Sequence, residues 1–181
     1  RLRIKEIPIN YYPRKGHSKL NPFRDGWRHL RLMLLYSPDY LFLVPGLFFF
    51  LFGSIFTSIL LFGPINILGI NLDIHPMILT SLLTILGFQI ILLGVYAKTY
   101  AVIHLNEKDK LVSLINRHIN LERGSLFGFI VILIGMIIGI RIFYVWSESN
   151  FGALDQIRPA IFTLTLIVIG IQTIFSSFLL S

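Results

Sequence analysis

Residues that could bind a phosphate cluster near the start of the sequence. Arg14, Ser18 and Lys19 surround Gly16 in a short polar segment. A guanidinium offers a planar fork of donors to phosphate, a hydroxyl adds one more hydrogen bond, and glycine lets backbone N–H groups approach an oxyanion. The spacing therefore predicts an anion site. A basic patch that only fixes membrane orientation is an equal alternative.

A helix that would position this cluster follows it directly. Asn21 can cap the helix, Pro22 suits its first turn, and Ser37-Pro38 would end it. Large apolar residues fall on one face and basic residues on another. The basic residues, which we expect to contact headgroups, are Arg24, Arg28 and Arg31. This pattern is typical of a helix lying in the membrane interface, so the anion would lie at the depth of lipid phosphates.

Four apolar stretches make up most of the remaining chain. The 181 residues are 55% hydrophobic and only 14% charged, whereas soluble domains carry about 25% charge. We place membrane spans at residues 40–62, 77–102, 125–147 and 159–180. A helix of about 22 residues reaches about 33 Å, enough for a hydrocarbon core of about 30 Å. The predicted fold class is a mainly α membrane protein with four transmembrane helices.

The distribution of basic residues predicts the orientation of the chain. Nine of the sixteen Lys and Arg residues lie before residue 40, and none lies in the loop at 63–76. The connection between the second and third spans carries five Lys and Arg residues. These are Lys98, Lys108, Lys110, Arg117 and Arg123. The connection is predicted to be two helical extensions meeting near 106–109, and a solvated hairpin with no function is an equal alternative. The last loop carries only Arg158. The positive-inside rule then places both termini in the cytosol.

Few polar residues interrupt the spans. Arg141 is the clearest ionisable residue, and we expect it to extend toward Glu148 or the headgroups. Gln89 and Gln172 are expected to bond helix to helix. No Asp or Glu lies inside the predicted spans, which argues against an ion-coupled transporter.

Glycines and histidines add weaker indications. The third span contains two G-x-x-x-G pairs, 124–128 and 135–139, which allow close helix approach and could form a dimer face. The five His residues follow no ligand pattern and the chain has no Cys, so no metal site is expected in it.

The first residues indicate a piece of a larger domain. Residues 3–11 alternate like a β-strand with Pro8 near an edge, and one strand cannot stand alone in water. We therefore expect the chain to be the C-terminal part of a longer protein. The alternative is a small membrane protein that is complete.

A motif in this region resembles a known family. Residues 6–20 read E-I-P-I-N-Y-Y-P-R-K-G-H-S-K-L, and D-G-W-R follows at 25–28. This order resembles the end of the catalytic domain in family 2 glycosyltransferases of the dolichol/polyprenyl-phosphate mannose (glucose) synthase type. There, E-x-P-I-x-Y leads to R-x-G-x-S-K-L and then D-G-x-R. The later spans resemble a four-span C-terminal region of many archaeal and bacterial members, so the resemblance covers nearly the whole chain.

The resemblance implies a specific domain organisation. Residues 1–20 would be the C-terminal edge of a GT-A catalytic domain, 21–39 the interfacial helix and 40–181 the transmembrane domain. The upstream domain would hold the nucleotide-sugar, a divalent metal (Mg or Mn) and an acidic Asp-x-Asp motif. Neither a catalytic residue nor a cofactor is therefore expected in this chain.

The resemblance also implies a reaction and a site. An oxygen of a polyprenyl (dolichyl) phosphate would attack the anomeric carbon of the nucleotide-sugar at the cytosolic face of a prokaryotic membrane. Arg14 and Ser18 occupy the positions that contact the lipid phosphate in the family, with Lys19 beside them. A homo-oligomer is possible, and nucleic acid is not an expected partner.

Two other functions remain open from the sequence. A stand-alone four-span protein of the GtrA-like kind, which moves polyprenyl-linked sugars across the membrane, would share the size and basic charge. A non-catalytic anchor or oligomerisation module would also contain four spans.

Overall fold

The computed structural model describes Pro8 and residues 22–36, 39–67, 69–105, 121–152 and 156–180. The chain forms two compact units, Arg1–Met33 and Leu34–Ser181. Most of the strand predicted at residues 3–11 lies outside the described residues.

Helix α1 (Pro22–Tyr36) starts at the proline that the sequence indicated. The three arginines of its predicted cationic face are all exposed. Phe23 and Trp27 on the apolar face are 89% and 62% exposed. An apolar face and a separate cationic face beside it make α1 an amphipathic helix, the kind that inserts one face into the headgroup boundary.

Four helices are long and apolar enough to cross a membrane, as predicted. The first consists of a π-helical turn, η1 (Asp39–Leu43), continued by α2 (Val44–Leu61). The others are α3 (Ile74–Leu105), α5 (Leu121–Glu148) and α6 (Ile157–Leu180). Each of these four helices begins one to four residues before the predicted span, because the helix includes residues that precede the apolar stretch. Residues 106–120, where the two helical extensions were predicted to meet, lie outside the described residues.

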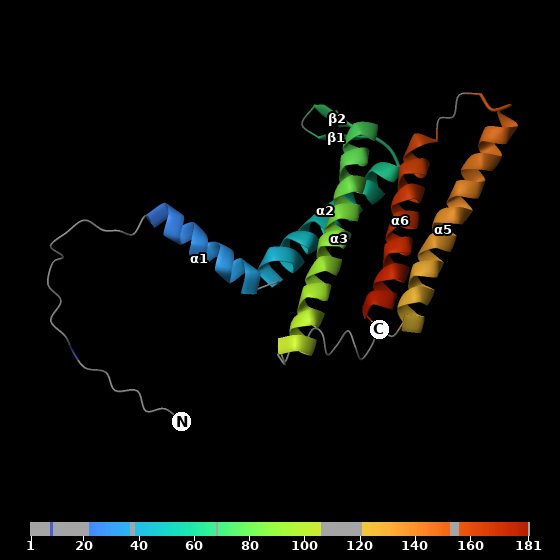
Figure 1. Cartoon of the computed structure of the whole chain (residues 1–181). Coiled ribbons are helices and arrows are strands. Elements are labelled where there is room, and N and C mark those ends of the chain that lie inside the picture. Colours follow the sequence, from blue (N-terminus) through green and yellow to red (C-terminus); the bar gives the residue numbers. More distant parts are fainter. Residues whose placement is uncertain are drawn as a thin grey trace. The chain divides into compact units, whose positions relative to one another are not determined.

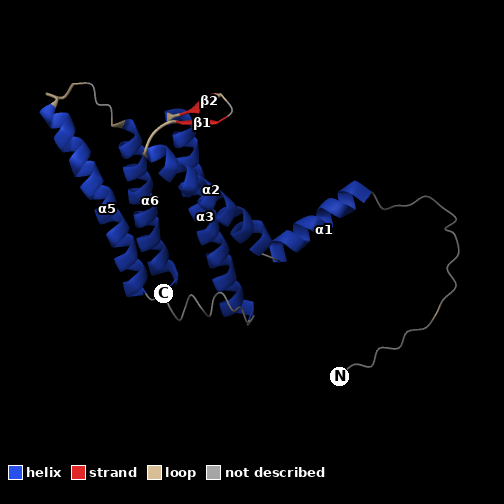
Figure 2. Ribbon diagram, turned by 180° about the vertical axis from the view of Figure 1, so that it is seen from behind, coloured by secondary structure: helices blue, strands red, loops and turns tan. Residues whose placement is uncertain are grey.

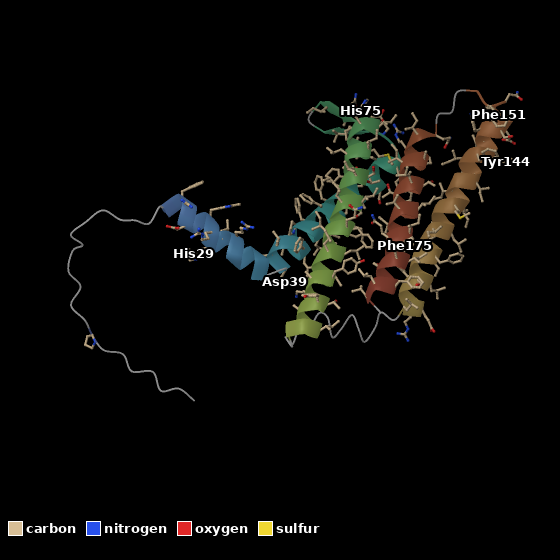
Figure 3. All side chains as sticks on the ribbon, in the orientation of Figure 1. His29, Asp39, His75, Tyr144, Phe151 and Phe175 are labelled. Carbon is tan, nitrogen blue, oxygen red and sulfur yellow. The ribbon has the colours of Figure 1, made fainter. Side chains whose placement is uncertain are left out.

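The helices pack as two antiparallel pairs, α2 with α3 and α5 with α6 (Figures 1 and 2). Helices α3 and α6 join the pairs. We call the end near Leu61 and Ile157 the β-hairpin end, and the end near Leu105 and Leu180 the C-terminal end. Side chains cover the bundle from end to end (Figure 3), and large apolar ones such as Phe175 lie at its surface. Small and hydroxylated residues are buried instead, which suits a protein whose solvent is lipid.

Glycines set the close approach within each pair. A Cβ on Gly53 of α2 would lie 2.6 Å from the Thr80 carbonyl of α3. In the second pair, a Cβ on Gly128 of α5 would lie 2.7 Å from the Gly170 carbonyl of α6. Thr57 also donates a buried hydrogen bond of 3.0 Å to Thr80. The α5 glycines at 128 and 135 therefore face α6 of the same chain, and this contact needs no dimer.

The loop predicted at 63–76 contains a β-hairpin that the sequence reading missed. Strand β1 (Ile65–Ile67) pairs antiparallel with β2 (Ile70–Leu72), and Ile65 lies opposite Leu72. Gly69 has a φ of +80°, which favours glycine in the turn. The alternating Ile and Asn residues on either side of this glycine were the available signal.

An aromatic cluster closes α5 at the β-hairpin end. The indole N–H of Trp146 donates a 3.1 Å hydrogen bond to the Gly152 carbonyl, and its ring meets Phe151 edge-on at 5.0 Å. Phe151 and Tyr144 lie together near this end in Figure 3. Aromatic residues gather at membrane interfaces, so the cluster suits a helix end at headgroup depth.

Candidate functional site

The predicted phosphate-binding residues Arg14, Ser18 and Lys19 lie outside the described residues. Their assignment stays a prediction. Of the predicted headgroup contacts, Arg24, Arg28 and Arg31 are all described, and about one turn of α1 separates each from the next. They form a cationic stripe because residues three and four apart share a helix face.

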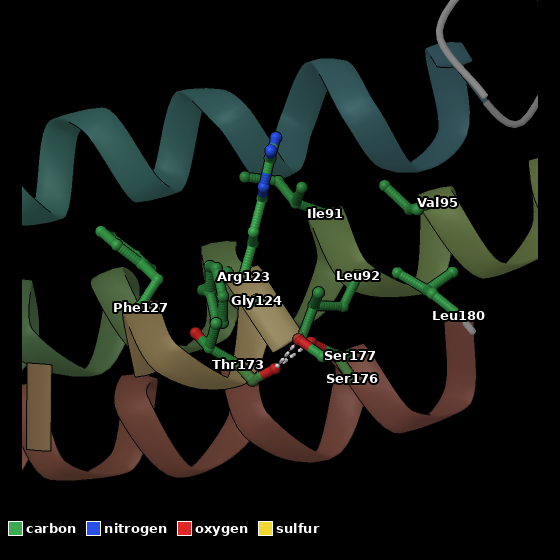
Figure 4. Close-up of a pocket in the computed structure, with 11 residues that line it drawn as sticks. Ile91, Leu92, Val95, Arg123, Gly124, Phe127, Thr173, Ser176, Ser177 and Leu180 are labelled. Atoms are coloured by element: carbon green, nitrogen blue, oxygen red, sulfur yellow. Dashed lines mark hydrogen bonds between the residues drawn. The ribbon is translucent and has the colours of Figure 1, made fainter. Parts of the chain in front are cut away.

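A cavity of about 340 Å³ lies between α3, α5 and α6 toward the C-terminal end (Figure 4). Such a volume lies within the range of small-molecule and lipid-chain pockets, about 300–1,000 Å³. The walls from α3 are Phe88, Ile91, Leu92 and Val95; α5 contributes Arg123, Gly124 and Phe127, and α6 contributes Thr173, Ser176, Ser177 and Leu180. Arg123 is the only ionisable residue among these lining residues.

Arg123 sits in the first turn of α5, so it lines the cavity toward the C-terminal end of the bundle. Its side chain is exposed, whereas the neighbouring Gly124 is buried. Figure 4 shows the Arg123 side chain reaching away from the hydroxyls of Ser176 and Ser177. The cavity therefore has an apolar interior and one cation at its mouth. The sequence reading missed this role, because it counted Arg123 only as a loop charge.

A second cavity, of about 300 Å³, lies next to the first, toward the middle of the bundle. The two share three lining residues, Phe88, Phe127 and Thr173. The second is also lined from α2, so it lies at the seam between the two helix pairs. The two neighbouring cavities are together called the seam groove.

An ion pair that the sequence did not predict lies at the C-terminal end. The Lys98 ammonium is 2.6 Å from the Asp39 carboxylate, and the two side chains are 8% and 47% exposed. The prediction that Lys98 belongs to a loop is wrong, because α3 continues beyond it to Leu105. A buried ammonium needs a nearby carboxylate, and Asp39 at the start of η1 supplies it.

A second ion pair joins the two helix pairs at the β-hairpin end. The Arg158 guanidinium donates hydrogen bonds of 3.2 and 2.5 Å to the same Asp73 carboxylate oxygen. A polar cavity of about 450 Å³ surrounds this pair. Because Asp73 precedes α3 and Arg158 opens α6, the contact ties both pairs together at this end.

Three predictions about polar residues in the spans have different outcomes. Gln89 is exposed on α3, so the expectation that it bonds to a neighbouring helix is wrong. The Gln172 side-chain oxygen is buried without a hydrogen-bond partner in the structure. Arg141 is exposed, and within the described part of α5 it forms no ion pair with Glu148. Extension toward the headgroups is the remaining expectation for Arg141.

The described residues contain no group of three or more His, Asp or Glu side chains that could hold a metal ion. The divalent metal implied by the resemblance stays a prediction for a catalytic domain upstream.

Together these features define a class: an integral membrane protein whose four described spans pack as two helix pairs and follow a cationic amphipathic helix in the sequence. Residues 95–181 match the family described as the glycosyltransferase family 2 C-terminal transmembrane region. The low-salt glycan biosynthesis hexosyltransferase Agl6 of Haloferax volcanii is 36% identical over 179 residues. No solved structure matches the chain. These matches support a C-terminal membrane region of the family 2 glycosyltransferase kind, as the sequence predicted.

The match with the hexosyltransferase covers 99% of this chain and 43% of that protein. The chain thus spans less than half the length of the curated relative it matches.

Proposed function

We propose that this chain is the membrane module of an enzyme that transfers a hexose from a nucleotide-sugar to a polyprenyl phosphate at the cytosolic face. In this reaction a phosphate oxygen of the lipid forms a bond to the anomeric carbon. The bond from that carbon to the nucleotide's phosphate oxygen breaks, and the nucleotide leaves with the electron pair. The module would hold the acceptor lipid while an upstream domain holds the donor.

The observation that carries this proposal is the cationic face of α1. Arg24, Arg28 and Arg31 are exposed on an amphipathic helix that begins two residues after the Ser18-Lys19-Leu20 segment. A helix of this kind lies at headgroup depth, so the preceding basic segment would meet a lipid phosphate there. A fixed cation beside that phosphate would orient the attacking oxygen.

The relative's name supports the hexose and the enzyme class, since it describes a hexosyltransferase of glycan biosynthesis. The family match supports a glycosyltransferase over a stand-alone GtrA-like protein. The basic residues before the first span support a cytosolic location of both termini.

Arg14→Ala in the full-length protein tests the proposal directly. Membranes containing the variant are given a labelled nucleotide-hexose and polyprenyl phosphate, and labelled lipid is extracted and counted. Loss of a charge-assisted hydrogen bond is expected to lower kcat/KM for the lipid about 10- to 100-fold, with nucleotide-sugar binding retained.

The matched control is Lys15→Ala, which removes a neighbouring positive charge without touching the R-x-G-x-S pattern. Its transfer rate should stay within about twofold of the wild type, because Lys15 occupies a variable position of the pattern and is not assigned to the phosphate. Equal rates for both variants and the wild type would refute the acceptor-site assignment. A wild-type protein that transfers sugar only to other acceptors would refute the proposed function.

A further inference from the structure

The seam groove extends deep into the bundle. On α6 its lining residues run from Leu180 at the C-terminal end to Phe162, near the β-hairpin end. Eighteen residues at 1.5 Å per residue correspond to about 27 Å along the helix axis. The hydrocarbon core is about 30 Å thick, so one leaflet accounts for about 15 Å of it. The groove is therefore much longer than one leaflet is deep.

The groove wall offers an occupant few free hydrogen-bond donors. The hydroxyls of Thr84, Thr165 and Thr173 donate hydrogen bonds of 2.8 Å to carbonyls in their own helices. Ser177 donates in the same way to the Thr173 carbonyl at 2.8 Å. With these donors satisfied, the wall presents methyl groups, aromatic rings and satisfied hydroxyls, a surface suited to a hydrocarbon chain.

The two ends of the groove differ in charge. Arg123 lies at the mouth near the C-terminal end, where an anionic headgroup would lie. At the other end the Asp73–Arg158 ion pair holds the two helix pairs together. A chain would therefore enter at the C-terminal end, with its phosphate near Arg123.

We propose that the seam groove binds the isoprenoid chain of the acceptor lipid, with Arg123 contacting its phosphate. This inference rests on the proposed function and adds the place where the lipid chain is held. An acyl chain of a phospholipid ends near the middle of the bilayer, whereas a polyprenyl chain is long enough to fill a groove of about 27 Å. The length of the groove and the cation that the described residues place at its mouth together favour a long, single-chain, phosphate-headed lipid.

The test uses a polyprenyl phosphate that carries a photoreactive diazirine in its distal isoprene units. The full-length protein in phosphatidylglycerol-free vesicles is irradiated, and labelled peptides are mapped by mass spectrometry. Labelling is expected on the deep lining residues Phe162 and Leu166, and excess unlabelled polyprenyl phosphate should remove it. Labelling mainly of lipid-facing residues such as Phe175, or equal competition by phosphatidylglycerol, would overturn the inference.

Two variants on α6 give a matched comparison. Thr173→Phe adds a ring where the two cavities meet, and should reduce deep labelling at least fivefold. Ile171→Phe adds a ring at an exposed position of the same helix and should leave labelling unchanged. If Thr173→Phe does not fold, Val131→Phe fills the groove from α5. Equal labelling of a folded groove-filling variant and the control would overturn the inference.

Arg123→Gln should weaken binding of the lipid about tenfold, since it loses a charge-assisted hydrogen bond. Arg141→Gln, on the same helix but outside the groove, is its control and should bind normally. Binding is measured without nucleotide-sugar, so it is independent of transfer. Transfer to polyprenyl phosphate without labelling of the groove overturns only this inference. Labelling of the groove without such transfer supports the lipid site and refutes the proposed function.

Discussion

Gly87 on α3 is the position where an added methyl group should do most damage to the bundle. A Cβ there would clash with the backbone nitrogen of Phe50 and lie 2.8 Å from both the Gly46 carbonyl oxygen and the Phe49 carbonyl carbon. All three atoms belong to the backbone of α2, so no side chain can rotate away. Ordinary contact begins at 3.4 Å. The two contacts at 2.8 Å alone would need the helices to separate by about 0.6 Å, and the closer contact with the Phe50 nitrogen would need more.

The separation gives the magnitude of the effect. A gap of about 0.5–1 Å removes a quarter to a half of each van der Waals contact along the α2–α3 face. In lipid these contacts are the main force between helices, since no hydrophobic effect drives the helices together. Overpacking of this kind typically costs about 1–3 kcal/mol, and we expect Gly87→Ala to lower the free energy of unfolding by that amount.

The matched control is Gly139→Ala on α5, where a Cβ would lie 3.5 Å from a methyl group of Thr163, an ordinary contact. Both substitutions change helix propensity equally, so their difference isolates packing. Unfolding of the full-length protein in mixed micelles is followed by circular dichroism as the fraction of SDS rises. Equal unfolding midpoints for the two variants would show that α2 and α3 do not approach as closely as described.

Two further predictions concern the ion pairs. Asp39→Asn should destabilise the protein more than Lys98→Met, because it leaves the buried ammonium without its carboxylate, whereas the carboxylate is half exposed. The reverse order in the same SDS titration would contradict this account. Asp73→Asn should cost about 1 kcal/mol at low salt and less at high salt, because the pair with Arg158 is partly exposed. A salt-independent loss would mean that packing rather than charge holds this end.

Much of the fold follows from local sequence patterns. Four apolar stretches long enough for a bilayer predict four spans whatever their packing, because exposed backbone groups in lipid require helices. Pro22 and the spacing of the α1 arginines likewise predict an amphipathic helix from residues that lie within a few turns of one another. The family resemblance came from a contiguous motif, which needs no tertiary information.

The sequence patterns were less informative where a polar residue's partner is distant along the chain. The sequence predicted Lys98 to be a loop cation. Its carboxylate partner, Asp39, lies 59 residues earlier, so no local pattern indicated the ion pair. Gln89 was predicted to bond to a neighbouring helix because it is polar, but polarity alone does not tell which face of a helix meets lipid. The β-hairpin was overlooked because its strands have only three residues each.

The sequence by itself indicated that lipid surrounds much of the chain, that there are four spans, and which family the chain resembles. Composition, the length of the apolar stretches and a contiguous motif carry that information. The tertiary structure decided which glycines bring helices together, which charges pair and where a groove remains. These features depend on residues brought together from different helices, and no local pattern records that pairing. Arg123 is the clearest case: in the sequence it is one of five cations in a connection, and in the structure it lines the mouth of the seam groove.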